Sequence, residues 1–119
     1  MTASPSNAVS HITTHVLDAA QGLPAPGVAV QLSALREGEW QLLAESVTDA
    51  DGRAKQLGPE ALPAGTYRLR FDTGAYFASR STPTFFPEAQ LTFVIDEEAR
   101  HYLVPLLLSP FAYSTYRGS

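Results

Sequence analysis

Short segments rich in β-branched and aromatic residues recur along the chain, and clusters of glycine, proline and aspartate interrupt them. This spacing is typical of an all-β sandwich. The clearest segment spans residues 66–72, where Tyr67, Leu69 and Phe71 alternate with polar residues, as expected for a strand with one buried face. A chain of 119 residues is long enough for one domain with a single core and too short for a second domain of ordinary size.

The same pattern predicts the remaining elements. Strands are expected at residues 12–17, 28–35, 40–47, 66–72, 90–95 and 101–109, with a short helix at 74–80. Residues 1–10 are small and polar without periodicity, so we expect a flexible N-terminal tail followed by one sandwich domain at 11–119.

Composition excludes several classes of function. Eight lysines and arginines against twelve acidic residues give a net charge of -4, which argues against a nucleic-acid partner. Without cysteine the chain has no disulfides, thiolate metal ligands or thiol nucleophiles. The first residues lack the pattern of a secretory signal, and no apolar run reaches the roughly 20 residues of a membrane helix. We therefore predict a cytoplasmic protein that does not bind membranes.

The strand at 101–109 is apolar on both faces, with Leu103, Pro105 and Leu107 on one face. A single sandwich core covers only one face, so the other is expected to be buried by a second subunit. The alternative is a central strand covered by a loop or helix of the same chain. Pro105 lacks an N–H for the ladder and predicts a bulge or an edge position.

Known catalytic and metal-binding patterns are mostly absent from the sequence. His11 and His15 would lie roughly 13 Å apart on a strand, too far to share one metal ion. The Asp-Gly turn at 49–52 resembles part of a calcium loop, but Val47 and Gly58 occupy its first and twelfth ligand positions. No G-x-S-x-G, G-x-G-x-x-G or P-loop motif occurs. We predict no metal and no organic cofactor.

Five segments carry a specific likeness: TTHVLD at 13–18, GLPAPGVAVQL at 22–32, DADGR at 49–53, YRLRFDTGAYF at 67–77 and VPLLLSPFAYSTYRGS at 104–119. Together they resemble the transthyretin-like 5-hydroxyisourate hydrolases from about residue 11 to the end. The terminal YRGS is the most specific element, because transthyretin itself does not end this way. The resemblance implies an all-β, transthyretin-like sandwich of about eight antiparallel strands with one short helix, assembled as a homotetramer.

The resemblance also implies a reaction and its residues. Members of the family open the ring of 5-hydroxyisourate, a product of urate oxidation, without a cofactor. The motifs assign catalytic roles to His15, Arg53 and Ser119, and substrate binding to His15, Arg53, Tyr116 and Arg117. A neutral imidazole can activate water, and a guanidinium can hold an anionic, oxygen-rich ring. Tyr116 offers a phenol for hydrogen bonding, and Ser119 offers a hydroxyl.

The sequence departs from the family at one substrate-site position. The family pattern is H-Y-H before V-P-L-L, and its second histidine belongs to the active site, whereas this chain has His101, Tyr102 and Leu103. Leu103 cannot move a proton, and His101 lies about 6.6 Å along the strand from the lost imidazole. We expect either a hydrolase that is slower than its relatives or one that relies on His15 together with the Ser119 terminus and ordered water. His101, like His11, is expected to be a surface residue.

Two other functions stay open on the sequence alone. One is a non-catalytic protein that binds a small aromatic ligand as transthyretin does, with Leu103 making the pocket more apolar. The other is an accessory β-sandwich without a small-molecule site.

Overall fold

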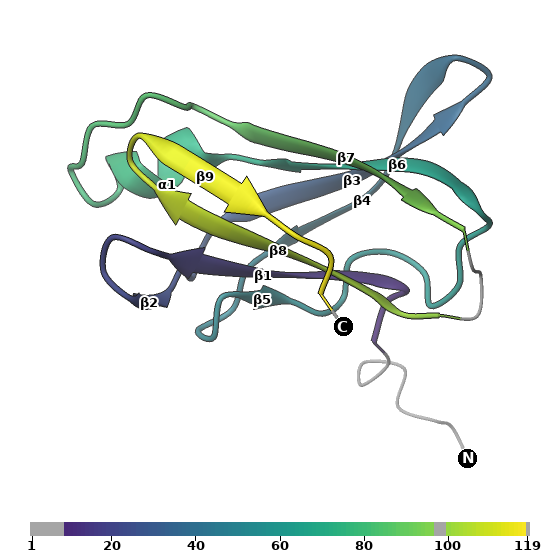
Figure 1. The fold of residues 1–119 in the computed structure, drawn as a ribbon, viewed down its shortest axis with the longest axis horizontal. Coiled ribbons are helices and arrows are strands. Elements are labelled where there is room, and N and C mark those ends of the chain that lie inside the picture. Colours follow the sequence, from purple (N-terminus) through teal and green to yellow (C-terminus); the bar gives the residue numbers. More distant parts are fainter. Residues whose placement is uncertain (1–8, 97–99, 119) are drawn as a thin grey trace.

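The computed structural model describes residues 9–96 and 100–118, which form two β-sheets and a short helix. The strands are β1 (Ile12–Asp18), β2 (Leu23–Pro24), β3 (Ala29–Arg36), β4 (Glu39–Val47), β5 (Arg53–Ala54), β6 (Gly65–Phe71), β7 (Ala89–Ile95), β8 (Tyr102–Ser109) and β9 (Ala112–Thr115), and the helix is α1 (Thr73–Ala78). The first sheet has the order β2-β1-β8-β9, with β5 also paired to β1, and the second has the order β4-β3-β6-β7. The sheets lie face to face as a sandwich (Figure 1), which confirms the predicted all-β class.

The core fills the space between the two sheets. In β6, Tyr67, Leu69 and Phe71 are almost fully buried while the alternating Arg68 and Arg70 are half-buried, as the period-2 pattern predicts. Other core side chains come from both sheets and from the connecting loops, among them Ile12, Val16, Val30, Leu32, Leu57, Leu106 and Leu108. Removal of these apolar side chains from water holds the two sheets together.

One strand pair differs from the antiparallel arrangement that the sequence predicts. Strands β1 and β8 run parallel, with Thr13 opposite Leu103 and His15 opposite Pro105. A tight hairpin forces antiparallel neighbours, but the chain between β1 and β8 passes through the whole second sheet. The long connection lets β8 run in either direction relative to β1. The parallel pairing brings the beginning and the end of the domain side by side.

Pro105 lies in the central strand β8, so the predicted bulge or edge position is wrong. In β8 the N–H and C=O groups of residues 102 and 108 point toward β1, as the bonds from Tyr102 N to His11 O and from Ala19 N to Leu108 O show. Pro105 therefore faces β9, and the β8–β9 register would set it opposite Tyr116. The ladder stops at Thr115, one residue before that position, so the missing donor of Pro105 marks the end of the pairing.

Strand β9 was not predicted, because its residues show no clean alternation. Three of its four residues are exposed, and it forms an edge strand after a tight turn from β8. An edge strand that buries little apolar surface leaves only a weak sequence signal. The two-residue strands β2 and β5 are too short to produce any signal.

His11 is buried, with 4% of its surface exposed, so the prediction of a surface residue is wrong. The chain before β1 packs against the loop after β5, where the Leu62 amide donates to His11 Nδ1 at 2.7 Å. Ser10, the last residue of the predicted tail, is also buried, and its hydroxyl bonds to Gly58 O and Leu57 N. His101 is exposed, as predicted.

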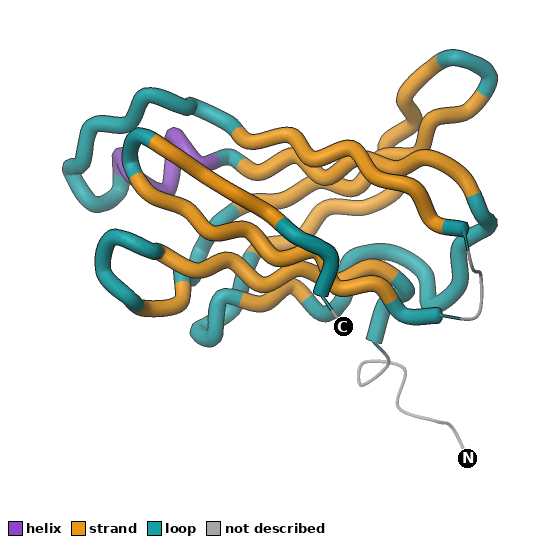
Figure 2. Tube along the Cα trace, in the orientation of Figure 1, coloured by secondary structure: helices purple, strands orange, loops and turns teal. Residues whose placement is uncertain are grey.

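Helix α1 lies at one end of the sandwich (Figure 2) and is joined to β1 by a buried hydrogen bond. The Asp72 side chain caps its start by accepting from Ala75 N. The Tyr76 hydroxyl donates to Asp18 Oδ2 at 2.8 Å, while Asp18 Oδ1 accepts from two backbone amides. Burial, together with the bond to Asp18, raises the pKa of Tyr76 to about 12, so the phenol remains a donor at neutral pH. No helix in the described part of the chain has the length and hydropathy of a membrane span.

We predict that Tyr76→Phe lowers the free energy of unfolding by about 1–3 kcal/mol, because the buried Asp18 carboxylate loses a donor. Denaturant titration followed by circular dichroism measures the change. The matched variant Tyr113→Phe removes a hydroxyl that makes no hydrogen bond within the described residues, and should change stability by less than about 0.5 kcal/mol. Equal losses in the two variants would contradict the assigned role of this bond.

Candidate active site

The turn between β4 and β5 is closed by the Asp49 side chain. Asp49 Oδ1 accepts from the amides of Asp51 at 2.9 Å and Arg53 at 3.0 Å, and Gly52 N donates to Asp49 O at 2.8 Å. The hydrogen bond from the Arg53 amide, against an opposing effect of burial, lowers the pKa of Asp49 below its ordinary value. The carboxylate therefore stays ionised and holds the turn in one shape.

Gly52 fixes this turn against β1. Its φ of 76° favours glycine, and a Cβ atom here would collide with the Val16 carbonyl oxygen and lie 3.0 Å from Ala25 N. The two segments are also joined by a hydrogen bond from Val16 N to Gly52 O at 2.7 Å. Glycine is thus required both by the backbone angle and by the contact.

The docked turn sets Arg53 beside His15. The two residues are register partners in the β1–β5 pair, and such cross-strand neighbours have Cβ atoms roughly 5 Å apart. His15 Nε2 lies 3.0 Å from the Asp51 carbonyl oxygen. Because a carbonyl only accepts, Nε2 carries the proton, and in the neutral ring Nδ1 is the nitrogen that can take up a proton.

On its other side His15 is followed by β8 and then by the C-terminal segment, residues 116–118. His15 is opposite Pro105, and the β8–β9 register continued by one residue sets Tyr116 opposite Pro105. The outer face of the first sheet thus carries a line of four residues, which we call the row of His15: Arg53, His15, Pro105 and Tyr116. At roughly 4.8 Å per strand, His15 and the position of Tyr116 are about 10 Å apart, with Pro105 between them.

Leu103 lies in the neighbouring row of the same face. It is opposite Thr13, whose hydroxyl is 2.9 Å from His101 Nε2. Partial desolvation of the ring, with a smaller effect of His11, lowers the pKa of His101, so the ring is neutral at physiological pH. His101 is thus hydrogen-bonded to Thr13. Position 103 is occupied by the half-buried isobutyl side chain of leucine.

The last described residues run along β8. The Thr115 hydroxyl donates to Pro105 O at 2.6 Å, and Gly118 N donates to Leu103 O at 2.9 Å. The Arg117 guanidinium lies 5.0 Å from the centre of the Tyr102 ring, a side chain that faces the core and not the row of His15. Ser119, predicted as a catalytic residue, lies outside the described residues.

The charge at the site comes from Arg53. Within residues 9–96 and 100–118, the one ion pair joins Arg70 to Glu88 on the second sheet. The Arg53 side chain is therefore available for an anionic ligand. The described residues contain no cluster of three or more His, Asp or Glu side chains that could hold a metal ion.

The family model for HIUase/Transthyretin matches residues 12–118 of this chain. The chain belongs to the HIUase/transthyretin family. The 5-hydroxyisourate hydrolase of Salmonella typhimurium is 50% identical over 109 residues, which cover 91% of this chain and 80% of that protein.

Two solved structures show the family fold. The 5-hydroxyisourate hydrolase of Klebsiella pneumoniae has 45% identity and a TM-score of 0.80, and the match covers 91% of this chain and 98% of that one. Sea bream transthyretin in complex with thyroxine has 40% identity and a TM-score of 0.85, over 90% and 93% of the two chains. The predicted HIUase/transthyretin family and its fold are therefore confirmed.

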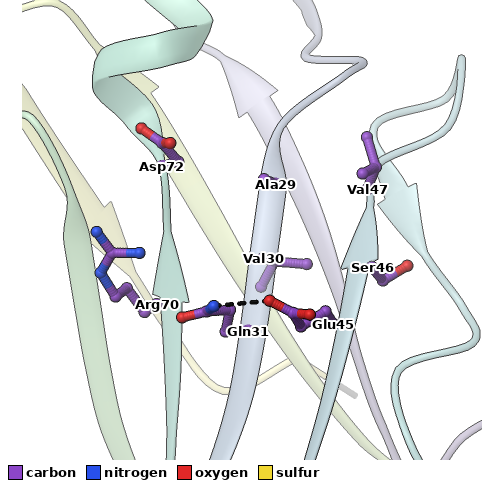
Figure 3. A pocket seen from close by; sticks show the side chains of 8 residues that line it. All are labelled: Ala29, Val30, Gln31, Glu45, Ser46, Val47, Arg70 and Asp72. Carbon is purple, nitrogen blue, oxygen red and sulfur yellow. Dashed lines mark hydrogen bonds between the residues drawn. The ribbon is translucent and has the colours of Figure 1, made fainter.

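Hollows lie on the second sheet and beside the C-terminal segment. A hollow of about 350 Å³ on the second sheet is lined by paired groups, with Gln31 donating to Glu45 at 2.8 Å (Figure 3). A more apolar groove of about 250 Å³ runs between β7 and the C-terminal segment, and Leu103, Tyr116 and Arg117 are part of its lining. The predicted site residues His15 and Arg53 line neither hollow.

The backbone groups of this site were not predicted from the sequence. The Asp51 carbonyl and the Asp49 carboxylate fix His15 and Arg53, yet neither was predicted as a site residue. The available signal was the D-x-D-G turn, because an aspartate at the start of such a turn accepts from amides two or more residues later.

We predict that Gly52→Ala costs at least about 2 kcal/mol more stability than Gly22→Ala. Gly22 has nearly the same φ, 72°, but open space where a Cβ would stand, so its substitution carries only the backbone strain of about 1–2 kcal/mol. Thermal and denaturant unfolding of both variants measure the difference. If both lose the same amount, the contact between the turn and β1 is not as tight as described.

Proposed function

We propose that this protein is a 5-hydroxyisourate hydrolase of urate degradation. The observation that carries the proposal is the pairing of His15 with Arg53 on the outer face of the first sheet, with His15 Nε2 held by the Asp51 carbonyl. The closely similar hydrolases of Salmonella typhimurium and Klebsiella pneumoniae support it.

The reaction we propose is the hydrolysis of a cyclic amide. His15 Nδ1 takes a proton from a water molecule, whose oxygen adds to the ring carbonyl, and Arg53 stabilises the oxyanion that forms. The carbon–nitrogen bond of the ring then breaks, and the leaving nitrogen receives a proton. The product is 2-oxo-4-hydroxy-4-carboxy-5-ureidoimidazoline, with one water consumed.

The C-terminal segment supplies the rest of the proposed site. Tyr116, continued in register opposite Pro105, is suited to hydrogen-bond the substrate ring. Ser119 follows Gly118 in the sequence and remains a proposed site residue through its hydroxyl. We propose that Leu103 borders the substrate as an apolar wall.

Leu103 makes the proposed enzyme slower than relatives with a second active-site histidine. A general acid or base contributes typically about 10²- to 10⁴-fold to a rate. The Thr13–His101 bond does not restore this group, because the hydroxyl joins His101 to β1 outside the row of His15.

We also propose that the active form is a homotetramer. On the outer face of β8, Leu103 and Leu107 are only half-buried in the single chain, and His15 beside them is also half-buried. Antiparallel packing of such faces from two copies would remove this apolar surface from water and exclude bulk solvent from the substrate.

A second candidate is a non-catalytic protein that binds a small aromatic ligand. The similarity to thyroxine-bound sea bream transthyretin and the apolar side chain at 103 favour it. This candidate retains binding but gives no acceleration of ring opening, so one assay separates the two.

The assay follows the absorbance of 5-hydroxyisourate after it is generated from urate by urate oxidase. We expect the protein to accelerate the decay, His15→Asn to lower kcat/KM by about 10²- to 10⁴-fold, and the control His101→Asn to change it less than twofold. A decay equal to the spontaneous rate with the unaltered protein would reject the enzyme and favour the ligand-binding candidate.

We predict that Leu103→His raises kcat/KM by about 10-fold or more, because it adds an imidazole to the outer face beside the substrate. Leu107→His is the matched control, since it makes the same change on the same face of β8, and no gain is expected from it. If neither variant gains activity while both fold normally, the absence of an imidazole at position 103 does not limit the rate.

A further inference from the structure

Tyr102 joins three parts of the chain at the beginning of β8. Its hydroxyl donates to Asp96 Oδ1 at 2.9 Å at the end of β7, and its ring lies 5.7 Å from the ring of His11 before β1. The side chain is 4% exposed. The Tyr102 ring is therefore held in place by β7, β8 and the segment before β1.

Arg117 lies over this fixed ring. Its guanidinium carbon is 5.0 Å from the ring centre, within the range in which a cation is attracted to the face of an aromatic ring. Because the ring belongs to the core side of β8, the contact draws Arg117 away from the outer face that carries His15.

Gly118, the next residue, is pressed against Leu103. Its amide donates to Leu103 O at 2.9 Å, and a Cβ at this position would lie 2.8 Å from Leu103 Cγ. A larger residue would require the Leu103 side chain or the segment to shift. The amide of Gly118 is thus a direct reporter of whether the segment is docked.

We infer that Arg117 is a positioning residue: by lying on Tyr102 it keeps the C-terminal segment docked on β8, so that Tyr116 faces the row of His15 and Arg53. This replaces the substrate-binding role that the resemblance implies for Arg117. The effect on catalysis rests on the proposed function, whereas the docking itself does not.

Docking has a distinct kinetic consequence. If only the docked segment binds substrate, the apparent affinity falls with the docked fraction. Saturating substrate restores the docked state, so KM should rise while kcat stays nearly constant. A residue that instead touched the reacting atoms would lower kcat.

The test compares Arg117→Leu with Arg117→Lys in the full chain. We expect Arg117→Leu to speed hydrogen exchange of the Gly118 amide, measured by NMR, about 3- to 10-fold, and to raise KM about 2- to 10-fold with kcat within twofold. Arg117→Lys keeps the cation and should show less than half of each effect. Arg68→Leu, which removes the cation over Trp40 on the second sheet, should leave both unchanged.

Tyr102→Phe keeps the ring while it removes the bond to Asp96, and should preserve slow exchange at Gly118. Unchanged Gly118 exchange in Arg117→Leu would overturn the inference. A fall in kcat with unchanged KM would overturn it as well and restore direct contact with substrate. If the unaltered protein proves inactive, the exchange measurement still tests the docking, so the two failures are distinguishable.

Discussion

The contact between the Asp49–Arg53 turn and β1 is the constraint on which the site depends. Gly52 lies so close to the Val16 carbonyl that no side chain fits, and the Asp49 carboxylate closes the turn by accepting two amides. Two features of the proposed site follow from one contact, because the Asp51 carbonyl then meets His15 Nε2 and Arg53 pairs with His15. A five-residue turn thereby selects the tautomer of the imidazole and supplies the neighbouring positive charge.

The topology of the first sheet completes the site from distant parts of the chain. Parallel pairing of β1 with β8 sets His15 beside Pro105, and the proline ends the ladder with β9 where the C-terminal segment begins. The segment then bonds to β8 again through Gly118. Pro105, which ends the ladder, thus lies between the His15 imidazole and the last described residues.

Much of the fold could be predicted from the sequence, because period-2 burial is a local signal that β6 shows clearly. The direction of strand pairing and the burial of a side chain are not set locally. The parallel β1–β8 pair and the burial of His11 depend on segments far apart in the sequence. The assignment of His15 and Arg53 to one site was predicted through the family resemblance, whereas their pairing across β1 and β5 was not. The Asp51 carbonyl was not, because a backbone atom leaves no residue-type signal, and the same holds for the contact that draws Arg117 toward Tyr102.

The most direct test of this account is the tautomer of His15, measured by nitrogen NMR on protein labelled at the histidine rings. We expect the neutral ring to carry its proton on Nε2, bonded to the Asp51 carbonyl, and Nδ1 to be bare. We also expect Gly52→Ala, if the variant folds, to disturb this state, because the turn that bears the carbonyl is displaced. A neutral His15 with its proton on Nδ1 would contradict the account, since the nitrogen assigned to water activation would already be occupied.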